Sequence, residues 1–230
     1  MFAEQSSLYH DKGRKMKFYD SFGLPNPDRV RIALNEKGVL DQVEIIQVNL
    51  WEGEHRTAEF KAKNPSVTIP LFELDNGLAI SETTAITEYI DHTFEGISLT
   101  GRSAEERAVV HMMQRRGEQK IVDAIGTYFH HGTPGFGPEI ELNQNKSWGE
   151  AHLQKTLDGM AYFDKVLQDT PYIAGENYSM ADITVFTGLN FSETHPKVMV
   201  PETLKALAEW RARIGARESC AFVPETMKVS

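Results

Sequence analysis

The sequence is poor in cysteine, with Cys220 as the one such residue among 230. A single cysteine cannot form a disulfide within the chain, and it cannot supply a zinc site built from several thiolates. Because this composition suits a reducing compartment, we expect a cytoplasmic protein with no metal site.

Long apolar runs are also missing. No apolar stretch approaches the roughly 18 residues of a membrane-spanning helix. Residues 1–15 lack the apolar segment of a secretory signal, so we interpret them as a flexible leader outside the fold. We therefore expect no membrane as partner.

Positive charge is the minority charge, with 24 Lys and Arg against 33 Asp and Glu and a net charge of −9. Proteins that bind nucleic acid usually carry a basic face, and the sequence shows no dense run of Lys and Arg. We therefore expect no nucleic acid as partner. A local positive pocket for a small anion is still compatible with this overall charge.

What the sequence does contain is a first half in which strands and helices alternate. The patterns predict four strands, at 16–19, 43–48, 69–74 and 78–80. They predict three helices, which begin at Pro27 and cover 58–63 and 82–93. The order β-α-β-α-β-β-α predicts a thioredoxin-like domain over residues 16–95.

The second half shows helical patterns and no hairpin. Capping boxes at Ser103 and Ser179 mark two helix starts. The expected helices are 103–129, 139–167, 179–189 and 201–214, with a loop at 130–138 that is rich in Gly and Pro. We therefore predict an α+β protein whose second domain, residues 101–220, is all-helical.

Four short motifs occur in the order found in cytosolic glutathione transferases. Asn64-Pro-Ser-Val-Thr-Ile-Pro70 resembles a loop of that family, and residues 82–90 resemble the helix start that follows it. Residues 29–34 resemble the family's first helix, and residues 179–182 resemble the capping box of its second domain. The resemblance spans residues 16 to about 214 and implies the thioredoxin-like plus helical fold.

Two further segments, residues 51–55 and 128–135, resemble an atypical fungal and bacterial subgroup that lacks the usual activating hydroxyl. Two positions depart from the family pattern. Val67 stands where the loop usually has Gly, and Thr83 stands where the helix start usually has Ser.

The resemblance implies that glutathione, a tripeptide with two carboxylates and one amine, is the cosubstrate and that no other cofactor is needed. A helix N-terminus attracts a carboxylate, and an extended residue before Pro pairs with a peptide. The glutathione-binding residues implied are His55, Arg56, Thr68, Ile69, Pro70, Glu82 and Thr83. Ser81 is an alternative explanation of the helix start, as an ordinary N-cap.

The group that activates the thiol is not evident, because Leu24 stands where serine-type relatives place their hydroxyl. Three alternatives remain open. Ser21 is the first; the Asn26 amide, with backbone N–H groups near Pro27, is the second. In the third, His130 or His131, with Thr127 or Thr133, holds a water that takes the thiol proton.

The electrophile is expected to bind between the domains, where aromatic residues would form the walls. The candidates are Phe22, Tyr128, Phe129 and Phe136, with Trp51 as a further one. The expected activity is conjugation of glutathione to small hydrophobic electrophiles, and the resemblance implies a homodimer. A non-catalytic binding module and a glutathione-dependent peroxidase or isomerase are the alternatives.

Overall fold

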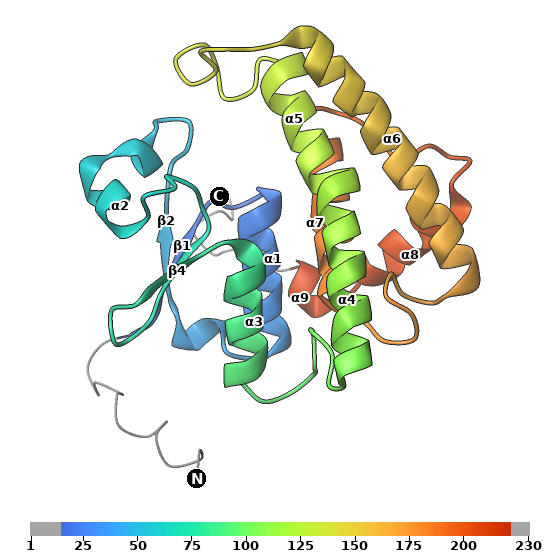
Figure 1. Ribbon diagram of the computed structural model, residues 1–230, viewed down its shortest axis with the longest axis horizontal. Coiled ribbons are helices and arrows are strands. Elements are labelled where there is room, and N and C mark those ends of the chain that lie inside the picture. Colours follow the sequence, from blue (N-terminus) through green and yellow to red (C-terminus); the bar gives the residue numbers. More distant parts are fainter. Residues whose placement is uncertain (1–14, 222–230) are drawn as a thin grey trace, which may run out of the picture.

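The computed structural model describes residues 15–221. The leader predicted at residues 1–15 lies outside this range except for its last residue. The first half contains a four-stranded sheet in the order β2-β1-β3-β4, drawn in Figure 1. Its strands are β1 (Lys17–Asp20), β2 (Glu44–Gln47), β3 (Leu71–Glu73) and β4 (Ala79–Ser81). β1 pairs in parallel with β2, whereas β3 pairs antiparallel with β1 and with β4.

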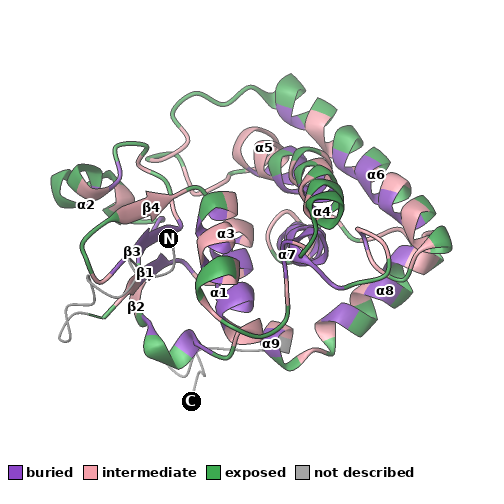
Figure 2. Cartoon of the chain, turned by 60° about the horizontal axis from the view of Figure 1, so that its bottom comes forward, coloured by how far each residue is buried: buried purple, intermediate pink, exposed green. Residues whose placement is uncertain are grey.

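Three helices complete this half: α1 (Pro25–Glu36), α2 (Ala58–Lys63) and α3 (Thr83–Thr93). Two short 3₁₀ turns, η1 (Leu40–Gln42) and η2 (Glu54–Arg56), lie in the connections. Figures 1 and 2 show α1 and α3 side by side between the sheet and the second half. Their apolar faces pack against the sheet, and Val30 of α1, Ile86 of α3 and Phe72 of β3 are fully buried in one core cluster.

The second half is helical throughout. It consists of α4 (Ala104–Gly117), a π-helical turn η3 (Glu118–Val122), α5 (Asp123–Gly132), α6 (Lys146–Asp169), α7 (Met180–Thr194), α8 (Lys205–Gly215) and α9 (Glu218–Ala221). Helix α7 is buried along most of its length and lies at the centre of this half (Figure 2). The chain therefore has the predicted α+β fold, with a thioredoxin-like sheet domain and a helical domain.

Both predicted capping boxes are present, at Ser103 with Glu106 and at Ser179 with Asp182. The helix predicted from residue 139 was placed wrongly, because it begins at Lys146 after the Asn145 side chain accepts a hydrogen bond from the backbone N–H of Trp148. Residues 137–142 instead form turns closed by backbone hydrogen bonds.

Other boundaries also differ from the prediction: the helix expected over 179–189 continues to Thr194, and the helix expected from 201 begins at Lys205. The helix expected to end near residue 129 continues to Gly132, so His130 and His131 lie on α5 and not in a loop. Helix α1 begins at Pro25, two residues before the predicted start, because proline is accepted in a first helical turn.

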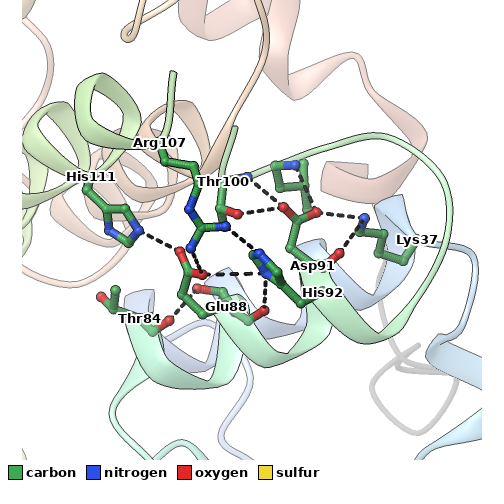
Figure 3. A network of polar contacts seen from close by, with 10 residues as sticks. Lys37, Thr84, Glu88, Asp91, His92, Thr100, Arg107 and His111 are labelled. Carbon is green, nitrogen blue, oxygen red and sulfur yellow. Dashed lines mark hydrogen bonds and ion pairs between the residues drawn. The ribbon is translucent and has the colours of Figure 1, made fainter. Parts of the chain in front are cut away.

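A polar network joins α3 to the start of the helical half (Figure 3). Glu88 on α3 contacts Arg107 and His111 of α4, at 2.8 and 2.5 Å. Asp91 pairs with Lys37 at 2.6 Å and accepts hydrogen bonds from the backbone N–H and the hydroxyl of Thr100. These contacts fix α3 against α4 and so set the spacing of the two halves.

None of the helices within residues 15–221 combines the length and apolar character needed to cross a lipid bilayer.

Candidate functional site

A cleft of about 630 Å³ lies where the two halves meet. The sheet domain contributes the first turn of α1 with Leu24, the loop residues Leu50, His55 and Arg56, and the segment 67–69. The helical domain contributes one side of α5, residues of the loop after it, and Phe191 of α7. Ten of the residues considered from the sequence line this cleft: Asn26, His55, Arg56, Thr68, Ile69, Thr127, Phe129, His130, His131 and Phe136.

The segment 64–70 forms one wall of the cleft. The Asn64 side chain holds it in place, since its amide donates to the carbonyl of Thr68 at 2.7 Å and its oxygen accepts from the N–H of Ser66 at 3.1 Å. The peptide bond between Ile69 and Pro70 is cis. In the described part of the chain, the backbone N–H and carbonyl of Ile69 form no hydrogen bond. An edge of this kind is suited to pairing with an extended peptide.

Val67 takes the conformation that explains its departure from the usual glycine. Its φ is +57°, in the left-handed region that favours Gly. The turn is therefore formed with Val67, stabilised by the hydrogen bond from its N–H to the Asn64 carbonyl at 3.0 Å.

The start of α3 lies next to this wall. Because Ser81 pairs with Leu71, the following residue, Glu82, lies beside Pro70. Within residues 15–221 no side chain caps α3, so the Ser81 N-cap considered from the sequence is not formed there. Glu82 is exposed with a φ of +69°, and Thr83 is buried behind it. The first N–H groups of α3 are therefore free to receive a carboxylate.

His55 and Arg56 face the cleft from the turn η2. Gly53 starts this turn with a φ of +71°. Burial, and to a smaller extent the charge of Arg56, lower the pKa of His55 below its ordinary value of 6.5. The Nδ1 atom of His55 is buried and has no hydrogen-bond partner within residues 15–221. Arg56 is exposed and forms no ion pair with other described residues.

The structure separates the candidates for thiol activation. Asn26 lines the cleft from the first turn of α1, together with Leu24. Ser21 is buried and is not among the cleft-lining residues.

His130 and His131 both line the cleft, from the last turn of α5. The Nδ1 atom of His130 lies 2.7 Å from Oε1 of Glu141, and Nδ1 of His131 accepts a hydrogen bond from the Asn145 backbone N–H at 3.0 Å. A carboxylate only accepts, and a backbone N–H only donates. The proton of neutral His130 is therefore on Nδ1, which leaves Nε2 as an acceptor, whereas neutral His131 carries its proton on Nε2.

The threonines proposed as partners of these histidines are engaged elsewhere. The Thr127 hydroxyl donates to the Asp123 carbonyl at 2.7 Å, and the Thr133 hydroxyl donates to the Phe129 carbonyl at 2.6 Å. Thr127 lines the cleft and Thr133 does not.

Aromatic rings form the far wall of the cleft. Phe129 is at the centre of the group, in edge contact with Phe136 at 5.1 Å and with Phe191 at 5.2 Å between ring centroids. Trp51 reaches across from the sheet domain to Phe136, at 4.9 Å. Phe191 was not identified from the sequence, where it is one of several apolar residues in a strongly buried helix.

Three of the proposed wall residues are not among those that line the cleft: Phe22, Tyr128 and Trp51, the last of which still contacts Phe136. The Phe22 ring is covered by the guanidinium of Arg31 at 4.6 Å, and Tyr128 lies over Gly132.

Glu141 is another cleft residue that the sequence did not reveal. Its Oε1 atom accepts from the Phe136 N–H at 3.0 Å as well as contacting His130. The sequence predicted a helix at Glu141, and no sequence pattern indicated that this residue would lie beside His130. Among the described residues, no group of three or more His, Cys, Asp or Glu side chains is placed to hold a metal ion.

Comparison with known proteins gives matches over both halves of the chain. A family model described as "Glutathione S-transferase, N-terminal domain" matches residues 25–93. A second, described as "Glutathione S-transferase, C-terminal domain", matches residues 139–221.

Individual proteins also match this chain. Glutathione S-transferase 2 of Saccharomyces cerevisiae is 50% identical over 216 residues, which cover 92% of each chain. Maleylacetoacetate isomerase of Mus musculus is 32% identical over 164 residues, or 67% of this chain and 68% of that one. The crystal structure of Gtt2 from Saccharomyces cerevisiae superposes with a TM-score of 0.86 at 50% identity, covering 89% of this chain and 98% of that chain.

Proposed function

The chain belongs to the glutathione S-transferase family, and from this premise we propose that it conjugates the thiol of glutathione to small hydrophobic electrophiles in the cytoplasm. One observation carries the proposal: a single cleft joins a backbone edge at Ile69, unpaired among residues 15–221, to an aromatic wall around Phe129. The first suits a peptide and the second suits an apolar ligand.

Glutathione would be bound at three points. Its cysteinyl backbone would pair with Ile69, next to Thr68 and Pro70. Its γ-glutamyl carboxylate would lie at the start of α3, on free N–H groups and the Thr83 hydroxyl, with Glu82 accepting from the ammonium. Its glycyl carboxylate would lie against His55 and Arg56.

The reaction requires a thiolate, and a free cysteine thiol has a pKa of about 8.5. A donor in the cleft that favours the thiolate, or an acceptor that takes the proton, would lower that value. The sulfur then attacks the electrophilic carbon, so that a carbon–sulfur bond forms as the bond to the leaving group breaks. With an aryl halide, the halide leaves with the bonding electrons, and the thiol proton passes to solvent.

The test uses the whole chain. Retention on immobilised glutathione, followed by an assay with an aryl halide, should show both binding and a thioether product. A chain that binds glutathione but turns over none of several aryl and alkyl electrophiles would overturn the enzymatic part of the proposal and leave a binding module.

A glutathione-dependent isomerase is a second candidate, because the similar mouse protein is named maleylacetoacetate isomerase. The two activities differ in what happens to glutathione. Conjugation consumes it and leaves a stable thioether, whereas isomerisation returns it unchanged. Mass spectrometry of glutathione after turnover therefore distinguishes them.

A further inference from the structure

Among the described residues of the first turn of α1, one residue, Asn26, has hydrogen-bond donors that remain available to a ligand. Pro25 and Pro27 have no N–H, and the N–H of Asp28 is bonded to the Leu24 carbonyl at 3.0 Å. Asn26, between the two prolines, contributes a backbone N–H and a side-chain amide, and it lines the cleft. The positive end of the α1 dipole therefore reaches the cleft through Asn26.

Arg29 fixes which way the Asn26 amide points. Its Nη1 donates to Oδ1 of Asn26 at 3.1 Å. Because a guanidinium has donors and no acceptor, the amide oxygen must face Arg29. The two N–H bonds of the amide then point away from Arg29, and they meet no acceptor in the described part of the chain.

Arg29 is itself held by Glu118 of the helical domain. Its Nη2 donates to Oε1 of Glu118 at 2.6 Å, and the two side chains are 2% and 12% exposed. Burial opposes the charge on Glu118, but the charge of Arg29, with hydrogen bonds from Arg29, Arg115 and Thr84, outweighs it and lowers the pKa of this carboxyl. A charged Glu118 thus anchors Arg29 from across the domain boundary.

Glu118 also reaches the other helix start. The same oxygen accepts from the Thr84 hydroxyl at 2.9 Å, one residue after Thr83. Glu118 is the first residue of the π-helical turn η3, a wide turn that is often found at functional sites. One carboxylate therefore contacts α1 through Arg29 and α3 through Thr84.

We propose that Asn26 donates its side-chain amide to the glutathione thiolate, and that Arg29 and Glu118 are positioning residues that aim this amide into the cleft. The proposal rests on the proposed binding of glutathione and selects one of the three activating groups considered from the sequence. A salt bridge that only joined the domains would not need the contact between Arg29 and Asn26.

The decisive variant is Asn26→Asp, which has the same shape. It keeps the oxygen that accepts from Arg29, and an acidic residue in the first turn of a helix is favourable, so the fold should be retained. It replaces the N–H donors with a negative oxygen. The thiol pKa of bound glutathione should rise by about one unit, which means about tenfold less thiolate at any pH below that pKa. The ultraviolet absorbance of the thiolate in the binary complex measures this pKa.

A double-mutant cycle tests the positioning role. Glu118→Gln should raise the thiol pKa by about half a unit in the unaltered chain. In an Asn26→Ala background the same change should have no effect, because the group it positions has gone. Glu193→Gln, which alters the Arg211–Glu193 pair away from the cleft, is the matched control and should leave the thiol pKa unchanged.

The outcomes are distinguishable because the thiol pKa is measured without turnover. An unchanged pKa in Asn26→Asp, or an equal effect of Glu118→Gln in both backgrounds, overturns this inference alone. Glutathione binding without any conjugation overturns the proposed reaction alone. An unaltered chain that does not bind glutathione overturns both.

Discussion

At the scale of single residues, His55 shows how burial changes a binding group. Its pKa is lowered by burial and by Arg56, so it is mainly neutral at neutral pH. A neutral imidazole still donates one hydrogen bond to a carboxylate. On acidification it gains a charge and becomes a stronger partner for the glycyl carboxylate.

We predict that His55→Ala weakens glutathione binding about tenfold near neutral pH, the loss of one hydrogen bond to a charged group. The ratio of the variant's Kd to that of the unaltered chain should be constant from about pH 8 to about pH 7 and grow as the pH falls below about 6.5, where His55 protonates. Isothermal calorimetry over this range checks it. His152→Ala, on α6 away from the cleft, should bind like the unaltered chain. A ratio of one at every pH would remove His55 from the site.

The cleft residues that the sequence predicted are those marked by local spacing. The loop ending at Pro70 and the helix start at Glu82 are each defined within a few residues, so short motifs identified them. Glu141 and Phe191 reach the cleft through distant contacts with His130 and Phe129. Contacts of that kind depend on how helices pack, which a single sequence does not encode in any short pattern.

At the scale of elements, Asp91 ties α3 to the end of α1 and to the linker that leads to the helical half. Its ion pair with Lys37 is almost fully enclosed, with side chains 4% and 2% exposed. Burial would raise the pKa of Asp91, but hydrogen bonds from Lys37, from Thr100 and from the N–H of Leu99 outweigh it and lower that pKa below 3.8. The carboxylate form therefore stabilises the folded state.

Asp91→Asn should lower the free energy of unfolding by about 3 kcal/mol at neutral pH, because it leaves Lys37 buried without its partner. The ionised form contributes its full stabilisation above the unfolded pKa of about 3.9 and loses it as the pH falls through the lower folded value. The difference between variant and unaltered chain should therefore shrink below about pH 4. Urea unfolding at several pH values measures this.

The exposed Asp158→Asn is the control and should change stability by less than about 0.5 kcal/mol. If the difference in unfolding free energy between Asp91→Asn and the unaltered chain stays constant as the pH is lowered, the ion pair does not carry the stabilisation.

Strand and helix identities were predictable at this scale, and helix ends were less so. Capping boxes mark starts, and both were found where the sequence placed them. The helix placed at residue 139 was wrong because residues 137–142 form turns that carry no strong breaker after Pro138. The π-helical turn η3 was not foreseen, since its residues are ordinary helix formers.

At the scale of the whole molecule, ion pairs join the two halves at both ends of α1. Arg29 contacts Glu118 at one end, and Glu36 at the other end accepts from Arg217 at 2.7 Å. The cleft lies near the first contact. The volume of the cleft therefore depends on how the two domains pack against each other. The order of helices and strands along the chain predicts where the cleft lies but not how large it is.

We also predict that the chain forms a homodimer, as the resemblance to glutathione transferases implies. Helix α4 carries exposed apolar side chains, Val109 and Met112, at 41% and 44% exposure. Such residues are commonly covered in an assembly. Sedimentation equilibrium should give twice the mass of one chain, and the mass of one chain at every concentration tested would contradict the prediction.

The π-helical turn between α4 and α5 has a consequence for the length of the chain. It accommodates an extra residue in its wide turn, whereas an α-helix advances about 100° per residue. Deleting one residue from Glu118–Val122 would close this wide turn and shift Glu118 away from its contacts with Arg29 and Thr84. This stretch should therefore reject insertions and deletions, and relatives that keep the contacts of Glu118 should keep the number of residues between Ser103 and Phe129 constant.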